Sequence, residues 1–112
     1  MLFRSYAVTT LTGEEAVEVR VRIEKALDRR AEPPEIPLLV ESEVIRNLRP
    51  EMQKIAKIIR KAVFTSQPII LRHHADADGI CSAVAIEQAV VALIRESGAD
   101  FDADYFLFKR SP

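Results

Sequence analysis

The sequence predicts an α/β protein with an N-terminal β-hairpin, a helical linker region, and then a βαβ unit from the start of a parallel sheet. Three observations support this class. Apolar and charged residues alternate over residues 17–24, a period typical of a half-buried strand. A proline-rich segment then separates this region from the rest of the chain. Beyond it, two short apolar runs flank a long apolar helix, which is the order of a βαβ unit.

The composition is that of a globular protein, for which we expect a cytoplasmic location. The chain has 112 residues, of which 48% are hydrophobic and 29% charged, and its formal net charge is -1. This balance argues against nucleic-acid binding by overall charge alone. The single cysteine excludes a disulfide within the chain. Neither a signal segment nor an apolar run of about 18 residues is evident, so we expect no membrane partner.

Residues 1–30 are expected to form the hairpin, which could be the end of a preceding small β domain. Its strands would be residues 2–9 and 17–24, with Gly13 in the turn between them. The β-branched residues at every second position favour this interpretation. The alternative is a helix, because Thr12 and Glu15 fit a capping box. In that case one helical face would hold the apolar residues Ala16, Val19, Ile23, Ala26 and Leu27.

Residues 31–40 are expected to be a stiff, extended connector, since closely spaced prolines continue neither a helix nor a central strand. This is the best domain boundary in the chain, and residues 41–112 would form the following domain. That domain would begin with two helices, over about residues 42–48 and 50–64, with Pro50 in the first turn of the second.

The second helix has a basic face, and the βαβ unit follows it. This face consists of Lys54, Lys57, Arg60 and Lys61. It could bind along a nucleic-acid backbone, or it could simply be exposed to solvent. Residues 69–71 and 104–108 predict strands, and residues 80–97 predict a buried helix that Gly98 ends. Because the chain stops just after a strand, we expect a fragment of a longer protein. Open sheet edges in such a fragment predict self-association.

The candidate catalytic and metal-binding residues lie between the first predicted strand and the helix, in the segment RHHADADGICSA at residues 72–83. Alternate residues of an extended loop project to one side, so His74, Asp76 and Asp78 can converge on one point. Two close carboxylates repel each other unless a cation intervenes, and Mn²⁺ or Mg²⁺ accepts carboxylate and imidazole ligands. We therefore expect all three residues to bind metal, with Asp76 and Asp78 as the catalytic residues. The alternative is that Asp78 merely caps the helix.

Four further residues are expected to contact the phosphate or the substrate. Arg72 at the edge of the site could hold a phosphate, and His73, out of phase with the three ligands, would support them or touch the substrate. Gly79 permits a sharp turn into the helix, which would direct the N–H groups of residues 80–82, that of Ser82 included, towards an anion. Cys81 has no evident base beside it, so we expect a buried structural thiol.

The run from Ile70 to Ala83 resembles the first motif of the DHH phosphoesterase superfamily, and most closely its archaeal RecJ-like single-strand exonuclease branch. In this resemblance His74 stands at the first acidic position of the motif, and Asp76 and Asp78 stand at the next two. The resemblance implies that residues 41–112 begin a DHH-type catalytic domain. It also implies a site for two Mn²⁺ or Mg²⁺ ions, phosphodiester hydrolysis, and single-stranded DNA or RNA as the partner.

Two departures from the family limit what this chain can do alone. The later motifs, including the Asp-His-His that names the family, do not occur before Pro112, and two-metal hydrolysis needs ligands for both ions. Some branches have a metal-binding His at the position of Arg72, which cannot ligate a metal. Two alternatives stay open: a phosphoesterase of the same superfamily that acts on small nucleotides or pyrophosphate, and a non-catalytic binding or scaffold fragment.

Overall fold

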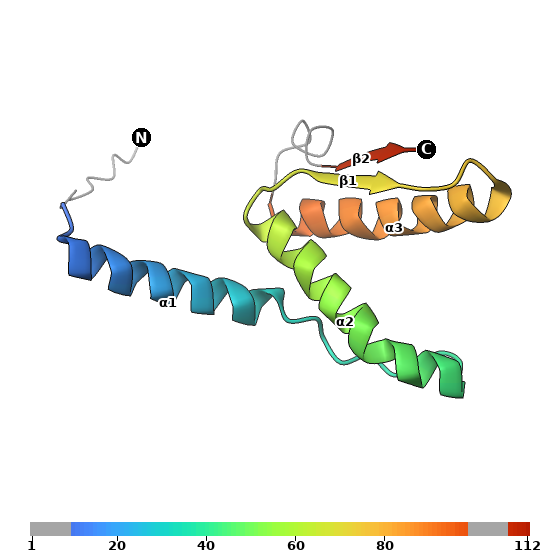
Figure 1. Cartoon of the computed structure of the whole chain (residues 1–112), viewed down its shortest axis with the longest axis horizontal. Helices are drawn as coiled ribbons and strands as arrows, with labels where there is room; N and C mark the ends of the chain where they lie inside the picture. The colour runs from blue at the N-terminus through green and yellow to red at the C-terminus, as the bar shows by residue number, and fades with distance from the viewer. Residues whose placement is uncertain (1–9, 99–107) are drawn as a thin grey trace, which may run out of the picture.

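The computed structural model describes residues 10–98 and 108–112, which form three α-helices and a two-stranded parallel sheet (Figure 1). In chain order the elements are α1 (Gly13–Ala31), α2 (Glu43–Phe64), β1 (Ile69–Arg72), α3 (Ala77–Glu96) and β2 (Phe108–Ser111). Ile69 of β1 lies opposite Phe108 of β2 in the parallel register. The predicted α/β class and its strand–helix–strand order are confirmed. Residues 104–107 of the predicted second strand lie outside the described residues.

The predicted strand at residues 17–24 is wrong, because these residues lie in α1. Thr12 and Glu15 form the capping box, in which the Thr12 N–H donates to the Glu15 carboxylate at 3.1 Å and the Glu15 N–H donates to the Thr12 hydroxyl at 3.5 Å. This cap satisfies N–H groups that a helix start leaves unpaired, and the helix then pairs its own backbone without a partner strand. The other strand of the predicted hairpin, residues 2–9, lies outside the described residues.

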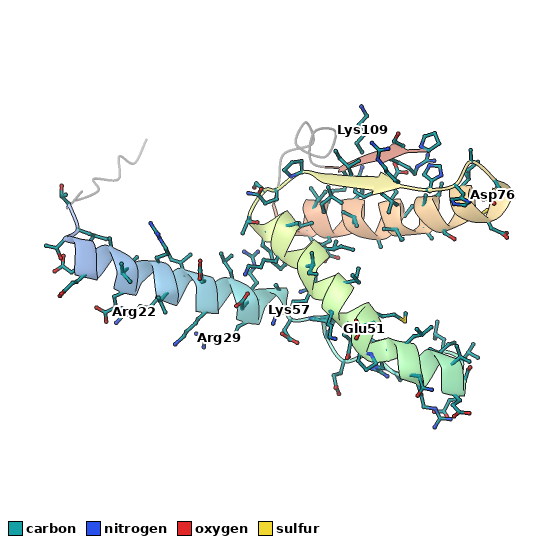
Figure 2. The ribbon with its side chains drawn as sticks, in the orientation of Figure 1. Arg22, Arg29, Glu51, Lys57, Asp76 and Lys109 are labelled. Atoms are coloured by element: carbon teal, nitrogen blue, oxygen red, sulfur yellow. The ribbon has the colours of Figure 1, made fainter. Side chains whose placement is uncertain are left out.

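The two helices predicted over residues 42–64 are one continuous helix, α2, with Pro50 inside it. Proline has no N–H and crowds the preceding turn, so helices bend at this residue. Figure 2 shows a change of direction near Glu51, the next residue. Apolar residues with helical spacing occur on both sides of the bend.

The core lies where the C-terminal end of α2 meets α3 and the sheet. Its buried residues are Val63, Val90, Ile94 and Phe108. Partly buried apolar residues pack around them, namely Ile59, Phe64, Ile69, Leu71 and Leu93. α3 covers one face of the sheet, whereas α1 extends away from this core (Figure 1). The core therefore fixes the β1–α3 connection, where the predicted site lies.

α3 begins three residues before its predicted start, and it ends as predicted at Gly98, whose φ of 83° suits glycine. Within the described part of the chain, α3 alone is long and apolar enough to cross a membrane, judged by length and composition only. The buried residues of α3 are Ala83, Val90 and Ile94, so this helix, which was predicted to be buried, is only partly buried in the structure. Glu87 also pairs with Arg110 of β2 at 2.6 Å.

Candidate metal and phosphate site

The candidate site is the short loop that joins β1 to α3, at the carboxyl end of β1. Asp76 is the N-cap of α3, and its Oδ1 accepts the N–H of Gly79 at 2.8 Å. The Asp76 carbonyl accepts the N–H of Ile80 at 2.9 Å, which closes the first helical turn. The cap thus fixes both the loop and the direction in which α3 starts.

Gly79 makes the tight packing of this loop possible. A Cβ at this position would lie 2.3 Å from the His74 carbonyl oxygen and 2.7 Å from Asp76 Oδ1. Atoms cannot approach so closely, so only glycine allows α3 to start against the backbone of His74. The predicted role of Gly79 in the turn therefore has a specific cause, which is the close approach of the loop to the helix.

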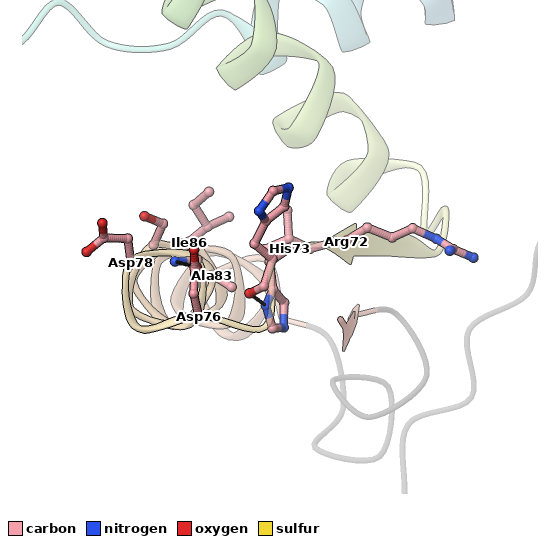
Figure 3. Close-up of a pocket in the computed structure, with 10 residues that line it drawn as sticks. Arg72, His73, Asp76, Asp78, Ala83 and Ile86 are labelled. Carbon is pink, nitrogen blue, oxygen red and sulfur yellow. Dashed lines mark hydrogen bonds between the residues drawn. The ribbon is translucent and has the colours of Figure 1, made fainter.

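The loop borders an open pocket of about 390 Å³ at this end of the sheet (Figure 3). All seven predicted site residues line it, namely Arg72, His73, His74, Asp76, Asp78, Gly79 and Ser82. Its apolar wall consists of Leu71, Ala83 and Ile86, which the sequence reasoning missed. The i, i+3, i+4, i+7 spacing of residues 79, 82, 83 and 86 is a signal that could have identified the two helical residues of this wall.

The three expected metal ligands are near one another in sequence but are not gathered at one point. In the described residues, no group of three His, Cys, Asp or Glu side chains is placed to hold a metal ion. The expectation assumed an extended loop through Asp78, whereas α3 already begins at Ala77. Figure 3 shows the Asp78 carboxylate directed away from His73, and Asp76 between them. The donor chemistry nevertheless fits a hard divalent ion, because carboxylates and imidazoles line one pocket.

The two histidines differ in what their side chains can do. His73 Nδ1 lies 2.8 Å from the His74 carbonyl oxygen. A carbonyl can only accept, so Nδ1 is the donor in this contact, and Nε2 is the nitrogen that could bind a metal ion. Metal-binding histidines commonly show this arrangement, with one ring nitrogen donating to a backbone carbonyl. His74, the predicted ligand, has an exposed side chain.

The early start of α3 also changes which backbone N–H groups face the site. The N–H groups of residues 80–82 were expected to point at an anion, but they lie inside the helix and pair with carbonyls four residues earlier. Gly79 donates to the Asp76 cap instead. The first-turn N–H groups of Ala77 and Asp78 are those that a helix start leaves for an anion.

Two other predicted residues lie differently from expectation. Cys81 is exposed rather than buried, although Ala83, two residues further along α3, is buried. Arg72 lines the pocket, but Figure 3 shows its side chain extending away from Asp76 and Asp78. Its expected role in holding a phosphate therefore stays a prediction.

The basic face of α2 is largely occupied by contacts with the C-terminal end of α1 and the connector. Lys57 pairs with Glu32 at 2.8 Å, and Lys61 pairs with Asp28 at 2.7 Å. Arg60 donates to backbone carbonyls of residues 30 and 31, which have no partners in their own helix. Lys54 pairs with Glu51 on the same helix at 2.6 Å. Lys57, Arg60 and Lys61 thus hold the end of α1 and the start of the connector against α2, and this leaves little support for a nucleic-acid track.

Comparison with known proteins gives two close matches, while no family model matches the chain. An uncharacterized protein of Methanocaldococcus jannaschii is 52% identical over 103 residues, which are 91% of this chain and 14% of that protein. A solved structure described as a DHH domain, from a member of the S1p family of ribosomal proteins, is 47% identical with a TM-score of 0.81. The match covers 88% of this chain and 23% of the solved one. This chain therefore spans a minor part of both proteins.

Proposed function

We propose that this chain, whose likeness to a solved DHH domain supports the DHH superfamily, is part of a divalent-metal-dependent phosphodiesterase. The substrate that we favour is single-stranded DNA or RNA, degraded in the manner of a RecJ-like exonuclease. The single observation that carries the proposal is the pocket at the β1–α3 connection, where two carboxylates and two imidazoles surround a helix N-terminus. This is the edge at which α/β sheets bind ligands.

In this proposal the side chains that hold Mn²⁺ or Mg²⁺ are Asp76, Asp78 and His74, and His73 Nε2 is a further donor. Asp76 has two tasks, since Oδ1 holds the start of α3 and Oδ2 is left for the ion. A bound divalent ion stabilises charge on the phosphate and lowers the pKa of the attacking water. Two ions need more ligands than these, so the remaining ligands would come from outside this chain.

The residues around the carboxylates would bind the phosphate itself. The first-turn N–H groups of α3 and its helix dipole favour an anion at this position. Ser82 lies one turn further along the same wall of the pocket, and Arg72 lies at its edge. Together these groups would orient a phosphodiester against the ion-binding carboxylates. Ala83 and Ile86 belong to the apolar wall of the same pocket.

The proposal is tested with the full-length protein that contains this chain. Two variants replace a carboxylate with an amide. With Mn²⁺ and an end-labelled single-stranded oligonucleotide, we expect Asp76→Asn and Asp78→Asn each to slow hydrolysis by at least about 100-fold. Asn caps helices as well as Asp does, so Asp76→Asn changes the ligand charge while keeping the fold. Glu14→Gln at the far end of α1 is the matched control and leaves the rate unchanged. Full activity in both Asp variants would sink the proposal.

A further inference from the structure

We propose that α1 is a dimerisation helix, whose exposed apolar seam pairs in an antiparallel sense with α1 of a second copy of this chain. This inference stands apart from the proposed phosphodiesterase function, because α1 lies away from the β1–α3 pocket (Figure 1). It gives the predicted self-association a defined surface, which is a helix rather than an open sheet edge.

The seam follows from the spacing of apolar residues along α1. They recur at intervals of three, four and three residues, which is the repeat that packs two helices together in a coiled coil. The seam consists of Ala16, Val19, Ile23 and Ala26. Val19 is 38% exposed and Ile23 is 54% exposed, so the described residues do not cover its centre. A helix with this pattern and no covering element presents a face that fits another helix.

The C-terminal end of α1 decides the direction of pairing. The last turn is fixed to α2, with Asp28 paired to Lys61 and the Arg30 guanidinium 4.2 Å from the centre of the Phe64 ring. A parallel pair would bring two α2 helices to the same end and place Arg30, the next seam position, opposite itself. An antiparallel pair places the two α2 helices at opposite ends of the helix pair. It also keeps Arg30 of one copy away from Arg30 of the other.

Antiparallel pairing also matches the side chains layer by layer. Val19 of one copy would lie opposite Ile23 of the other in the two central layers. Ala16 would lie opposite Ala26 in the two outer layers, where small residues let the helices approach closely. The same patch then serves both copies, as a two-fold symmetric interface requires.

The charges of α1 complement one another in this arrangement. Residues 13–19 hold three glutamates and no cation, whereas residues 20–31 hold five cations and two acids. Antiparallel packing places the acidic half of each helix beside the basic half of the other, with Glu15 and Arg29 flanking the seam. The helix dipoles also oppose each other favourably. Glu18 and Arg22 of each copy lie 3.8 Å apart within one helix, which reduces repulsion between the central arginines.

Sedimentation of the 112-residue chain tests the proposal. We expect the mass to rise from 12.6 kDa to twice that value as the concentration increases to about 1 mM. Ile23→Glu places a charge in the seam and abolishes the dimer. Val21→Glu is the matched control, because Val21 is 44% exposed on α1 but lies off the seam, and this variant still dimerises. Circular dichroism shows whether both variants keep their helix content.

Disulfide trapping tests the direction. In a Cys81→Ser background, a mixture of Ala16→Cys and Ala26→Cys chains should form the mixed disulfide in at least tenfold excess over either homodisulfide. Predominant homodisulfides would overturn the antiparallel arrangement. A chain that stays monomeric throughout, or a dimer that Ile23→Glu leaves intact, would overturn the proposal itself. The second result would point to another surface, such as the exposed apolar residues of α2.

Discussion

Gly79 and Asp76 show how single residues fix the β1–α3 connection. The Asp76 carboxylate accepts the Gly79 N–H, and the same glycine leaves room for the His74 carbonyl. Both contacts require the present backbone path from β1 into α3, so the two residues together position the pocket. That Asp and Gly stand near a helix start was predictable from the sequence. Which aspartate is the cap was not, because the choice depends on where the helix begins.

At this scale we predict that Gly79→Ala destabilises the protein by about 1–3 kcal/mol, since the new methyl group collides with the His74 backbone. Urea unfolding followed by circular dichroism measures the change. Gly13→Ala is the matched control, because nothing lies within 4 Å of a Cβ at that position. It should be neutral or stabilise the protein by up to about 1 kcal/mol. Equal unfolding midpoints for the two variants would contradict this account of the loop.

At the scale of elements, α1 and α2 are joined mainly by polar contacts between the end of one helix and the flank of the other. Phe64 adds to them, with the Arg30 guanidinium 4.2 Å and the Arg60 guanidinium 5.4 Å from its ring centre. Such contacts are sensitive to charge and salt in a way that an apolar interface is not. The sequence showed the cations of α2 but not their partners, because Asp28 and Glu32 lie about 30 residues away and come close only when α1 packs against α2.

We predict that this junction weakens in acid. The hydrogen bond and the charge of Lys61 lower the pKa of Asp28, so its contribution is complete above the ordinary pKa of about 4 and is lost as pH falls through the lowered value. The carboxyl carbon shift of Asp28 in an NMR titration gives the midpoint. Lys61→Gln should raise that midpoint towards the ordinary value. An identical midpoint in this variant would mean that Lys61 is not the cause.

Lys57 behaves in the opposite sense on the same junction. Its hydrogen bond to Glu32 raises the pKa of Lys57, so, while Glu32 is ionised, the contribution of the Lys57 charge is complete below its ordinary pKa of about 10 and is lost as pH rises through the raised value. Near neutral pH, both the Asp28–Lys61 pair and the Glu32–Lys57 pair are formed. The last turn of α1 therefore stays fixed to α2.

At the scale of the whole molecule, the chain is extended around a small core. Its radius of gyration is 18.4 Å, whereas a compact domain of this length has about 13 Å. Large apolar side chains along one side of α2 are exposed, namely Val44, Leu48, Ile55 and Ile58. The stability of the described fold therefore depends on few residues.

Two isoleucines test whether stability depends on few buried residues. Ile94 is fully buried, whereas Ile55 is 57% exposed. We predict that Ile94→Ala costs about 2–5 kcal/mol, which is comparable with all that a small core supplies. Ile55→Ala should change the free energy of unfolding by no more than about 0.5 kcal/mol. Thermal unfolding of both variants measures the difference. A loss on Ile55→Ala as large as that on Ile94→Ala would show that the exposed side of α2 is covered in solution.

The sequence by itself determined the βαβ unit and its polar loop, because short apolar runs, a long apolar helix and an Asp-x-Asp-Gly connection are local signals. It favoured a strand at residues 17–24, because β-branched residues alternate there, although the capping box and an apolar helical face supported the helix that the structure contains. The tertiary structure decided what depends on contacts distant in sequence. These are the pairing of Lys57 and Lys61 with the end of α1, and the place of Asp78 inside α3 rather than beside Asp76.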